Sequence, residues 1–213
     1  MRLHGYWRSG AAYRVRIALA LKGIAYEQVN HDLRIGAQAD EAYRALNPQG
    51  LVPAIETDDG IVVTQSLAIL EWLEEMHPAV PLLPADPAGR ATVRAMASLI
   101  ACDVHPLGNL RVLNALRDEF AADDEVRKAW IARWTASGFA ALETLVRRHG
   151  SGFAYGDEPT LADCCLVPQV YSAERFAVDL SPYPRLVAAT ERARSLPAVA
   201  AAHPSRQPDA DPA

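Results

Sequence analysis

Short strand-like runs and longer runs with helical spacing follow one another through the N-terminal part of the chain. Residues 1–6 suit a strand, and residues 11–22 form an apolar-rich helical segment that stops at Gly23, a residue type favoured just after a helix. The same patterns predict strands at residues 26–30, 53–56 and 61–64 and helices at residues 40–46 and 67–76. The predicted order is therefore βαβαββα.

Turn and capping signals refine this prediction. Asp58-Asp59-Gly60 separates two apolar runs, and an Asp-Gly pair in that position strongly favours a β-hairpin. Ser66 precedes the helix at 67–76 and is expected to be its N-cap, because a serine oxygen accepts a hydrogen bond from a free amide of the first turn. Farther along, Thr160 and Asp163 have the spacing of a capping box, in which each side chain binds the other residue's backbone amide.

A proline-rich segment separates this part from the rest of the chain. Pro81, Pro84 and Pro87 prevent a helix or a central strand from continuing there, so we place a domain at residues 1–80 and a linker at residues 81–87. Residues 88–213 then form an all-helical domain whose tail, from residue 203, is expected to lack regular structure. Its helices are predicted at residues 90–103, 110–120, 125–148, 161–176 and 183–195.

Composition and charge exclude several classes of protein. Hydrophobic residues make up 50% of the chain and charged residues 22%, as in folded globular proteins. The formal net charge of −5 argues against a nucleic-acid-binding protein, because surfaces that bind phosphates are basic. Uncharged stretches such as residues 60–70 are far shorter than the ~20 apolar residues of a membrane span. The first eight residues lack an apolar signal core, so we expect a cytoplasmic protein.

The cysteines predict neither a disulfide framework nor a metal site. Cys164 and Cys165 are adjacent, and the chain has no CxxC pair. Cys102 and His105 have a spacing seen in metal sites, but no second pair of ligands accompanies them. We therefore expect no bound metal.

Ser9 lies where the first predicted strand gives way to the first predicted helix. Its hydroxyl and the free amides of the first turn would converge at the positive end of the helix dipole, which favours an anion. Considered alone, Ser9 is more simply interpreted as an ordinary N-cap serine.

The two-part arrangement resembles the fold of cytosolic glutathione transferases over the whole chain: a thioredoxin-like α/β domain followed by an all-α domain with a Thr/Asp capping box. Five segments look like the zeta class of that family, at residues 14–23, 45–53, 65–69, 166–176 and 206–209. One departure is clear. The zeta class typically carries Ser-Ser-Cys-Ser before the Arg-x-Arg segment, whereas this chain has Ser9-Gly10-Ala11-Ala12 and so lacks the family cysteine.

The resemblance implies glutathione as the cofactor. Ser9 would donate a hydrogen bond to the glutathione sulfur and favour its thiolate form. Gly10 would let the tripeptide approach the backbone closely. Val52-Pro53 resembles a cis peptide that presents the backbone N–H and C=O of Val52 to the cysteinyl part.

The remaining glutathione contacts implied by the resemblance come from polar side chains. Gln65 and Ser66 would hold the γ-glutamyl carboxylate at the N-terminus of a helix. Gln38 and Gln49 are candidates for the glycyl end.

The maleyl substrates of the class carry carboxylates, so an acidic protein must gather positive charge locally. Arg8 and Arg175 are the first candidates for carboxylate clamps, because a guanidinium binds a carboxylate through two parallel hydrogen bonds. Further candidates for substrate binding lie around the break at Pro106, with His105 and Asn109 expected on one helix face and His105 considered as a general acid. They are His105, Asn109 and Arg111. We assign Arg14 and Arg16, inside the first predicted helix, to structure.

The implied activity is the glutathione-dependent cis–trans isomerisation of maleylacetoacetate to fumarylacetoacetate in aromatic amino-acid catabolism. Thiolate addition to the cis double bond, bond rotation and elimination give the trans product. Catalytic roles fall on Ser9, Arg8 and Arg175. The resemblance also implies a homodimer.

Three alternatives stay open. Maleylpyruvate isomerases of the same class share the Trp-Arg-Ser-Gly opening, and no residue pattern separates the two substrates, although residues 13–16 and 110–113 favour maleylacetoacetate. A general conjugating transferase would need a roomy apolar site. A non-catalytic interaction module with this fold would be expected to lose Ser9 or the Gln65-Ser66 pair.

Overall fold

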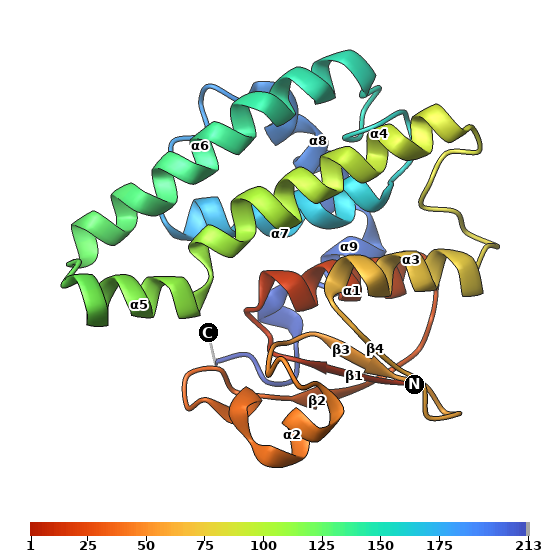
Figure 1. Ribbon diagram of the computed structural model, residues 1–213. Helices are drawn as coiled ribbons and strands as arrows, with labels where there is room; N and C mark the ends of the chain where they lie inside the picture. Colours follow the sequence, from red (N-terminus) through yellow and green to blue (C-terminus); the bar gives the residue numbers. More distant parts are fainter. Residues whose placement is uncertain (212–213) are drawn as a thin grey trace. The chain divides into compact units, whose positions relative to one another are not determined.

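The computed structural model describes residues 1–211 and divides into two compact units (Figure 1). One unit joins Met1–Leu82 with the C-terminal segment that begins at Ser195, and the other comprises Leu83–Arg194. This grouping differs from the predicted assignment of residues 88–213 to a single domain. Its physical cause is packing, since a short C-terminal helix lies against the first helix of the chain.

A four-stranded sheet forms the base of the N-terminal unit. Its strands are β1 (Arg2–Gly5), β2 (Glu27–Asn30), β3 (Ala54–Glu56) and β4 (Val62–Thr64). They are arranged in the order β2-β1-β3-β4; β1 pairs in parallel with β2, and the β1–β3 and β3–β4 pairs are antiparallel. The parallel pair requires a crossover connection, which the first helix supplies.

Helices cover this sheet on both faces. Figure 1 shows α1 and α3 on one face and α2 on the other. Their bounds are α1 (Gly10–Leu21), α2 (Glu41–Leu46), α3 (Ser66–Met76) and α9 (Pro197–Ala201). α1 packs against α3 and α9, and apolar side chains such as Ile17, Ile55 and Ile69 are buried between the helices and the sheet. Burial of these residues is the main source of stability in this unit.

The second unit is helical. It contains α4 (Pro87–Ser98), α5 (Leu110–Phe120), α6 (Asp124–His149), α7 (Leu161–Arg175) and most of α8 (Pro184–Ser195). α4 packs against α7, whose residues 161–170 are all buried, so α7 forms the centre of this core. Within residues 1–211, no helix has the length and apolar character needed to cross a membrane.

The predicted capping box is present at the start of α7. The Thr160 amide donates to Asp163 Oδ2 at 2.9 Å, and the Thr160 hydroxyl accepts from the first turn. Asp163 also accepts from the amide of Ala154 at 2.8 Å, which ties the preceding loop to the helix. Burial raises the pKa of Asp163 to about 6, although these hydrogen bonds oppose the shift.

Three sequence-based predictions of local structure differ from the structure in detail. The helix predicted at residues 90–103 begins instead at Pro87, because proline is tolerated in the first turn and Asp86 caps it, and the chain becomes π-helical at Leu99–Val104. Ser66 is not an N-cap: Gln65 occupies that position and Ser66 is the first helical residue. The tail from residue 203, which was expected to lack regular structure, contains a 3₁₀ turn at Pro204–Arg206. Residues 212 and 213 of this tail lie outside the described part of the chain.

Candidate functional site

The loop between β1 and α1 places Ser9 at the N-cap of α1, as its sequence position suggests. Ser9 has an extended backbone, and its Oγ accepts a hydrogen bond from the Ala12 amide at 3.2 Å. Because the oxygen accepts in this bond, the hydroxyl hydrogen can still donate to a ligand. Gly10 is the first helical residue. Anion-favouring amides and a hydroxyl donor therefore meet at this helix end.

Two side chains that precede Ser9 give this loop its chemical character. The guanidinium carbon of Arg8 lies 5.1 Å from the centre of the Trp7 ring, a cation–π contact that holds a positive charge next to Ser9 in the chain. Trp7 is buried, and its indole Nε1 has no hydrogen-bond partner within the structure. A buried donor without a partner is uncommon in folded proteins.

The Val52–Pro53 peptide is cis, which confirms the prediction. It directly precedes β3. The carbonyl of Leu51 accepts from the Tyr43 hydroxyl at 2.7 Å and from Asn47 Nδ2 at 2.6 Å. Two side chains therefore fix the backbone immediately before Val52.

The N-terminus of α3 combines an unusual backbone with a buried cation. Gln65 has φ +69°, a region that residues other than glycine rarely adopt and that is concentrated at functional sites. Its side chain donates to Gln49 Oε1. Ser66 is buried, and its Oγ accepts from the Arg14 guanidinium at 3.1 Å. An anion near these residues would meet both a helix N-terminus and a guanidinium.

Arg14 is a residue whose position the sequence reasoning missed. It lies in α1 and was assigned to structure, yet its side chain reaches the first residue of α3. The contact also shows that α1 and α3 begin at the same end of the N-terminal unit (Figure 1). No local signal in the sequence could have revealed it, because Arg14 and Ser66 are far apart in the chain.

Gln38 approaches the same segment through its backbone. A Cβ atom added to Gly50 would lie 3.2 Å from the Gln38 carbonyl oxygen, so the turn at Ala37–Ala39 lies next to the residues that precede Val52. The side-chain Oε1 of Gln38 is buried and has no hydrogen-bond partner within the structure. It is an acceptor that a ligand amide could satisfy.

The predicted substrate residues around Pro106 do not share one helix face. His105 lies in a 3₁₀ turn that ends at Gly108, whereas Asn109 is extended and caps α5 by accepting from the Arg111 amide at 3.2 Å. The expected i, i+4 relation between His105 and Asn109 is therefore wrong, because the helix ends before Asn109. Arg111 is exposed near the start of α5.

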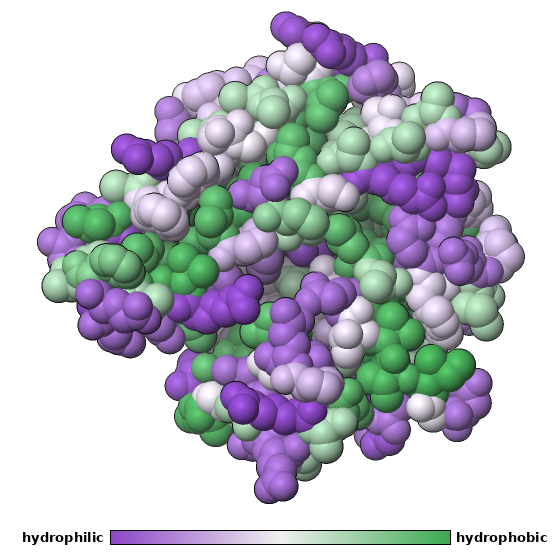
Figure 2. All heavy atoms as spheres, in the orientation of Figure 1, coloured by the Kyte–Doolittle hydropathy of each residue, from purple (hydrophilic) through white to green (hydrophobic). Residues whose placement is uncertain are grey.

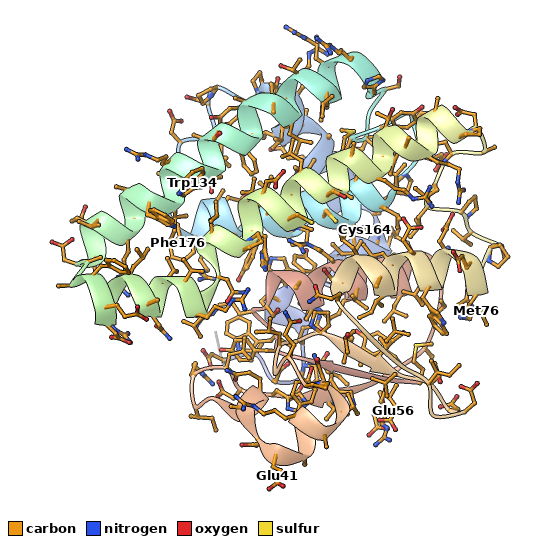
Figure 3. All side chains as sticks on the ribbon, viewed as in Figure 1. Glu41, Glu56, Met76, Trp134, Cys164 and Phe176 are labelled. Atoms are coloured by element: carbon orange, nitrogen blue, oxygen red, sulfur yellow. The ribbon has the colours of Figure 1, made fainter. Side chains whose placement is uncertain are left out.

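Arg175 is the last residue of α7 and is exposed. Its guanidinium carbon lies 4.7 Å from the centre of the Phe176 ring, which is labelled in Figure 3. The neighbouring carboxylate of Glu174 accepts two hydrogen bonds from Arg194, at 2.7 and 2.8 Å. The carboxylate of Glu174, which directly precedes Arg175 in the chain, is therefore paired with Arg194.

Comparison with known proteins identifies the family. The model of the glutathione S-transferase N-terminal domain matches residues 8–76, and that of the C-terminal domain matches residues 128–192. The chain belongs to the glutathione S-transferase family. A maleylacetoacetate isomerase of Pseudomonas aeruginosa is 48% identical to it over 98% of each chain. The expected two-part fold is confirmed.

Two solved structures are similar along nearly the whole chain. The holo structure of a maleyl pyruvate isomerase, described as a bacterial enzyme of the zeta class, is 47% identical with a TM-score of 0.97 and covers 99% of this chain and 100% of its own. A maleylacetoacetate isomerase from Methylobacterium extorquens AM1, with bound malonate and glutathione, is 42% identical with a TM-score of 0.95 and covers all of both chains. The resemblance to the zeta class is thereby confirmed.

Several groups of the N-terminal unit could bind an anionic peptide. Donors for an anion lie at the starts of α1 and α3. Val52 lies between these helices in the chain, and the Tyr43 hydroxyl binds the carbonyl of the preceding residue, Leu51. The buried Gln38 Oε1 supplies an acceptor without a partner in the described structure. Residues 1–211 contain no cluster of three or more metal-binding side chains.

Proposed function

We propose that this glutathione S-transferase isomerises maleylacetoacetate to fumarylacetoacetate with glutathione as its cofactor. The observation that carries the proposal is Ser9 at the N-cap of α1, with a hydroxyl that accepts from Ala12 and can donate outward. Relatives similar over the full length carry the names of maleyl isomerases, which supports the same reaction class.

Glutathione binding falls to the N-terminal unit in this proposal. Ser9 and Gly10 contact the cysteinyl sulfur, and the backbone of Val52, before Pro53, pairs with the cysteinyl amide groups. Gln65 and Ser66 hold the γ-glutamyl carboxylate, with Arg14 adding a positive charge. The glycyl end is assigned to Gln38 and Gln49.

When bound, glutathione supplies a nucleophilic sulfur whose reversible addition allows rotation about the former double bond. Ser9 donates a hydrogen bond that favours the ionised thiol, and the first turn of α1 adds the positive end of its dipole. Arg8 and Arg175 bind the carboxylates and stabilise negative charge that develops on the substrate. Further substrate contacts are assigned to His105, Asn109 and Arg111.

Maleylpyruvate is the alternative substrate, because a zeta-class maleyl pyruvate isomerase is as similar as the maleylacetoacetate isomerases. The test is a direct assay of both maleyl compounds with the purified protein, with and without glutathione. We expect turnover only with glutathione, and a higher kcat/KM for maleylacetoacetate. A higher value for maleylpyruvate would reverse the substrate assignment.

A non-catalytic binding module is the competing class of function. Such a module would bind immobilised glutathione and convert neither maleyl compound. Glutathione binding without turnover of either compound would therefore favour the module, and absence of binding would contradict both readings.

We also propose a cytoplasmic homodimer. Figure 2 shows hydrophobic side chains at the surface over α5 and the start of α6, where Leu110, Phe120 and Val126 are exposed. In the N-terminal unit Ile61 and Met76 are also exposed. A contiguous exposed apolar patch, such as the one over α5 and the start of α6, is typical of an association surface. Sedimentation should give twice the chain mass of 23.1 kDa, and a species of 23.1 kDa alone would contradict the dimer.

A further inference from the structure

The C-terminal segment of the chain contacts the loop that carries Ser9. The backbone N–H of Trp7 donates to Asp209 Oδ2 at 2.9 Å. The other carboxylate oxygen of Asp209 accepts from Gln28 Nε2 at 2.7 Å. One carboxylate thus connects the loop after β1 with β2, and all of these residues belong to the N-terminal unit.

Arg16 makes a second connection between the same two segments. It is buried in α1, and its Nε donates to the Ala202 carbonyl of the C-terminal segment at 3.1 Å. Its terminal nitrogens donate to the carbonyls of Trp7 at 2.8 Å and of Tyr6 at 3.4 Å. The Arg16 guanidinium, which lies in α1, therefore binds the loop that directly precedes this helix.

These contacts fix both ends of residue Trp7, since Asp209 binds its N–H and Arg16 binds its C=O. The turn is closed by the Ser9 amide, which donates to the Tyr6 carbonyl at 3.0 Å. Arg8 and Ser9 follow directly in the chain, so the direction of the Ser9 hydroxyl depends on this turn. Misplacement of a reacting group by about 1 Å can lower a rate by about 100-fold.

We propose that Asp209 is a positioning residue, which acts with Arg16 to hold the Trp7–Ser9 turn so that the Ser9 hydroxyl meets the glutathione sulfur. The inference rests on the proposed function, in which Ser9 contacts that sulfur. It gives the C-terminal segment a role in catalysis without contact to substrate. Asp209 suits this role because its two oxygens accept from two different parts of the fold, whereas an asparagine offers one acceptor oxygen.

The test compares Asp209→Ala, Asp209→Asn and Asp209→Glu with a matched control, Asp211→Asn. Asp211 is also an aspartate of the C-terminal segment, but its carboxylate pairs with Arg34 at 2.8 Å. For each protein, ultraviolet absorbance of the thiolate is followed against pH with bound glutathione, together with glutathione affinity, kcat and KM. Thermal unfolding of each variant reports its stability.

We expect Asp209→Ala to raise the pKa of the bound thiol by about one unit and to lower kcat/KM about tenfold. Asp209→Asn should show a smaller shift in the same direction, and Asp209→Glu, which keeps two acceptor oxygens, should restore part of the loss. Asp211→Asn should behave as the wild type. A purely structural role would lower the unfolding temperature and leave the thiol pKa unchanged.

The outcomes separate this inference from the proposed function. If wild-type protein binds and ionises glutathione and the folded Asp209 variants do so with the same pH profile, the inference is overturned and the proposed function stands. Should wild-type protein fail to bind glutathione, both are overturned. If Asp209→Ala does not fold, the folded Asp209→Asn variant decides: an unchanged thiol pKa rejects the positioning role, and a raised one supports it.

Discussion

The two groups of predicted site residues differ in what holds them. In the N-terminal unit, Ser9 and Ser66 lie at helix starts, and the side chain of each is held by a hydrogen bond within the fold, from the Ala12 amide and from Arg14 respectively. In the helical unit, Arg111 and Arg175 are long, exposed side chains near helix ends. Under the proposed function, the glutathione site is therefore held by hydrogen bonds inside the fold, whereas these two substrate-binding arginines lie at exposed helix ends.

The largest effect on activity should come from Ser9 in the N-terminal unit. Ser9→Ala removes the hydroxyl donor, so we expect kcat/KM to fall about 100-fold, the effect of losing one donor to a developing anion. The apparent pKa of the bound thiol in the pH–rate profile at saturating glutathione should rise, because the thiolate loses a hydrogen bond. Loss of the cap should also reduce the free energy of unfolding by about 1 kcal/mol.

A matched control separates capping from catalysis. Asp123 caps α6 by accepting from the Val126 amide at 2.9 Å, and it lies in the other unit. Asp123→Ala should lower stability by about the same 1 kcal/mol and leave the pH–rate profile unchanged. An unaltered rate and an unaltered thiol pKa in Ser9→Ala would remove Ser9 from the mechanism.

Arg175→Lys tests the exposed arginines of the helical unit, Arg111 and Arg175. The lysine keeps the charge but loses the two parallel donors, so kcat/KM for the dicarboxylate should fall about tenfold while glutathione affinity stays unchanged. Arg117, an exposed arginine of α5 that pairs with Asp118, provides the control, and Arg117→Lys should alter neither quantity. Equal losses in substrate kinetics and glutathione affinity in Arg175→Lys would place Arg175 in folding or cofactor binding and would break the contrast between the two groups.

The same contrast explains how much the sequence could predict. Ser9 at a helix start follows from a local pattern, whereas the cis Val52–Pro53 peptide was expected only from the resemblance to the family; the structure contains both. The contact of Arg14 with Ser66 and that of Asp209 with Trp7 join distant parts of the chain, and only tertiary packing creates them. In the helical unit a local pattern was misleading. The spacing of His105 and Asn109 predicted that they share one helix face, whereas the structure has a 3₁₀ turn that ends at Gly108 and an extended Asn109.

A smaller, pH-dependent effect should arise in the N-terminal unit from two histidines. His4 Nδ1 and His31 Nε2 lie 3.0 Å apart, and burial lowers the pKa of both rings below the ordinary value of 6.5. Their hydrogen bond requires one ring nitrogen to accept, which full protonation prevents. A base with a lowered pKa in the folded state contributes stability above pH 6.5 that is lost as the pH falls through its folded pKa.

Urea unfolding between pH 8 and pH 5 measures this effect. The free energy of unfolding of the wild type should fall on the acid side of the histidine range, and His31→Gln should reduce that fall. His149→Gln, at an exposed histidine of α6, serves as the control and should leave the slope unchanged. An identical slope in the wild type and in His31→Gln would show that the histidine pair does not control the acid response.

The smallest effect is expected from removing every cysteine. The chain has Ala11 where the zeta class typically carries a cysteine. Cys164 and Cys165 are fully buried in α7, where Figure 3 labels Cys164, and a buried free cysteine behaves as a small hydrophobic residue. None of the proposed site residues is a cysteine, and in the proposed function the reacting sulfur is that of glutathione.

We accordingly expect the triple variant Cys102→Ser, Cys164→Ala and Cys165→Ala to isomerise the maleyl substrate at close to the wild-type rate and still to require glutathione. Its free energy of unfolding should fall by about 1 kcal/mol per buried sulfur removed, because a small cavity is left behind. Cys102 is exposed, in the π-helical segment after α4, so restoring it alone separates any contribution it makes from the packing of α7. A folded but inactive triple variant would mean that a protein thiol takes part in the reaction. Turnover by the wild type without glutathione would mean that glutathione is not the required nucleophile, and either result would overturn the proposed mechanism.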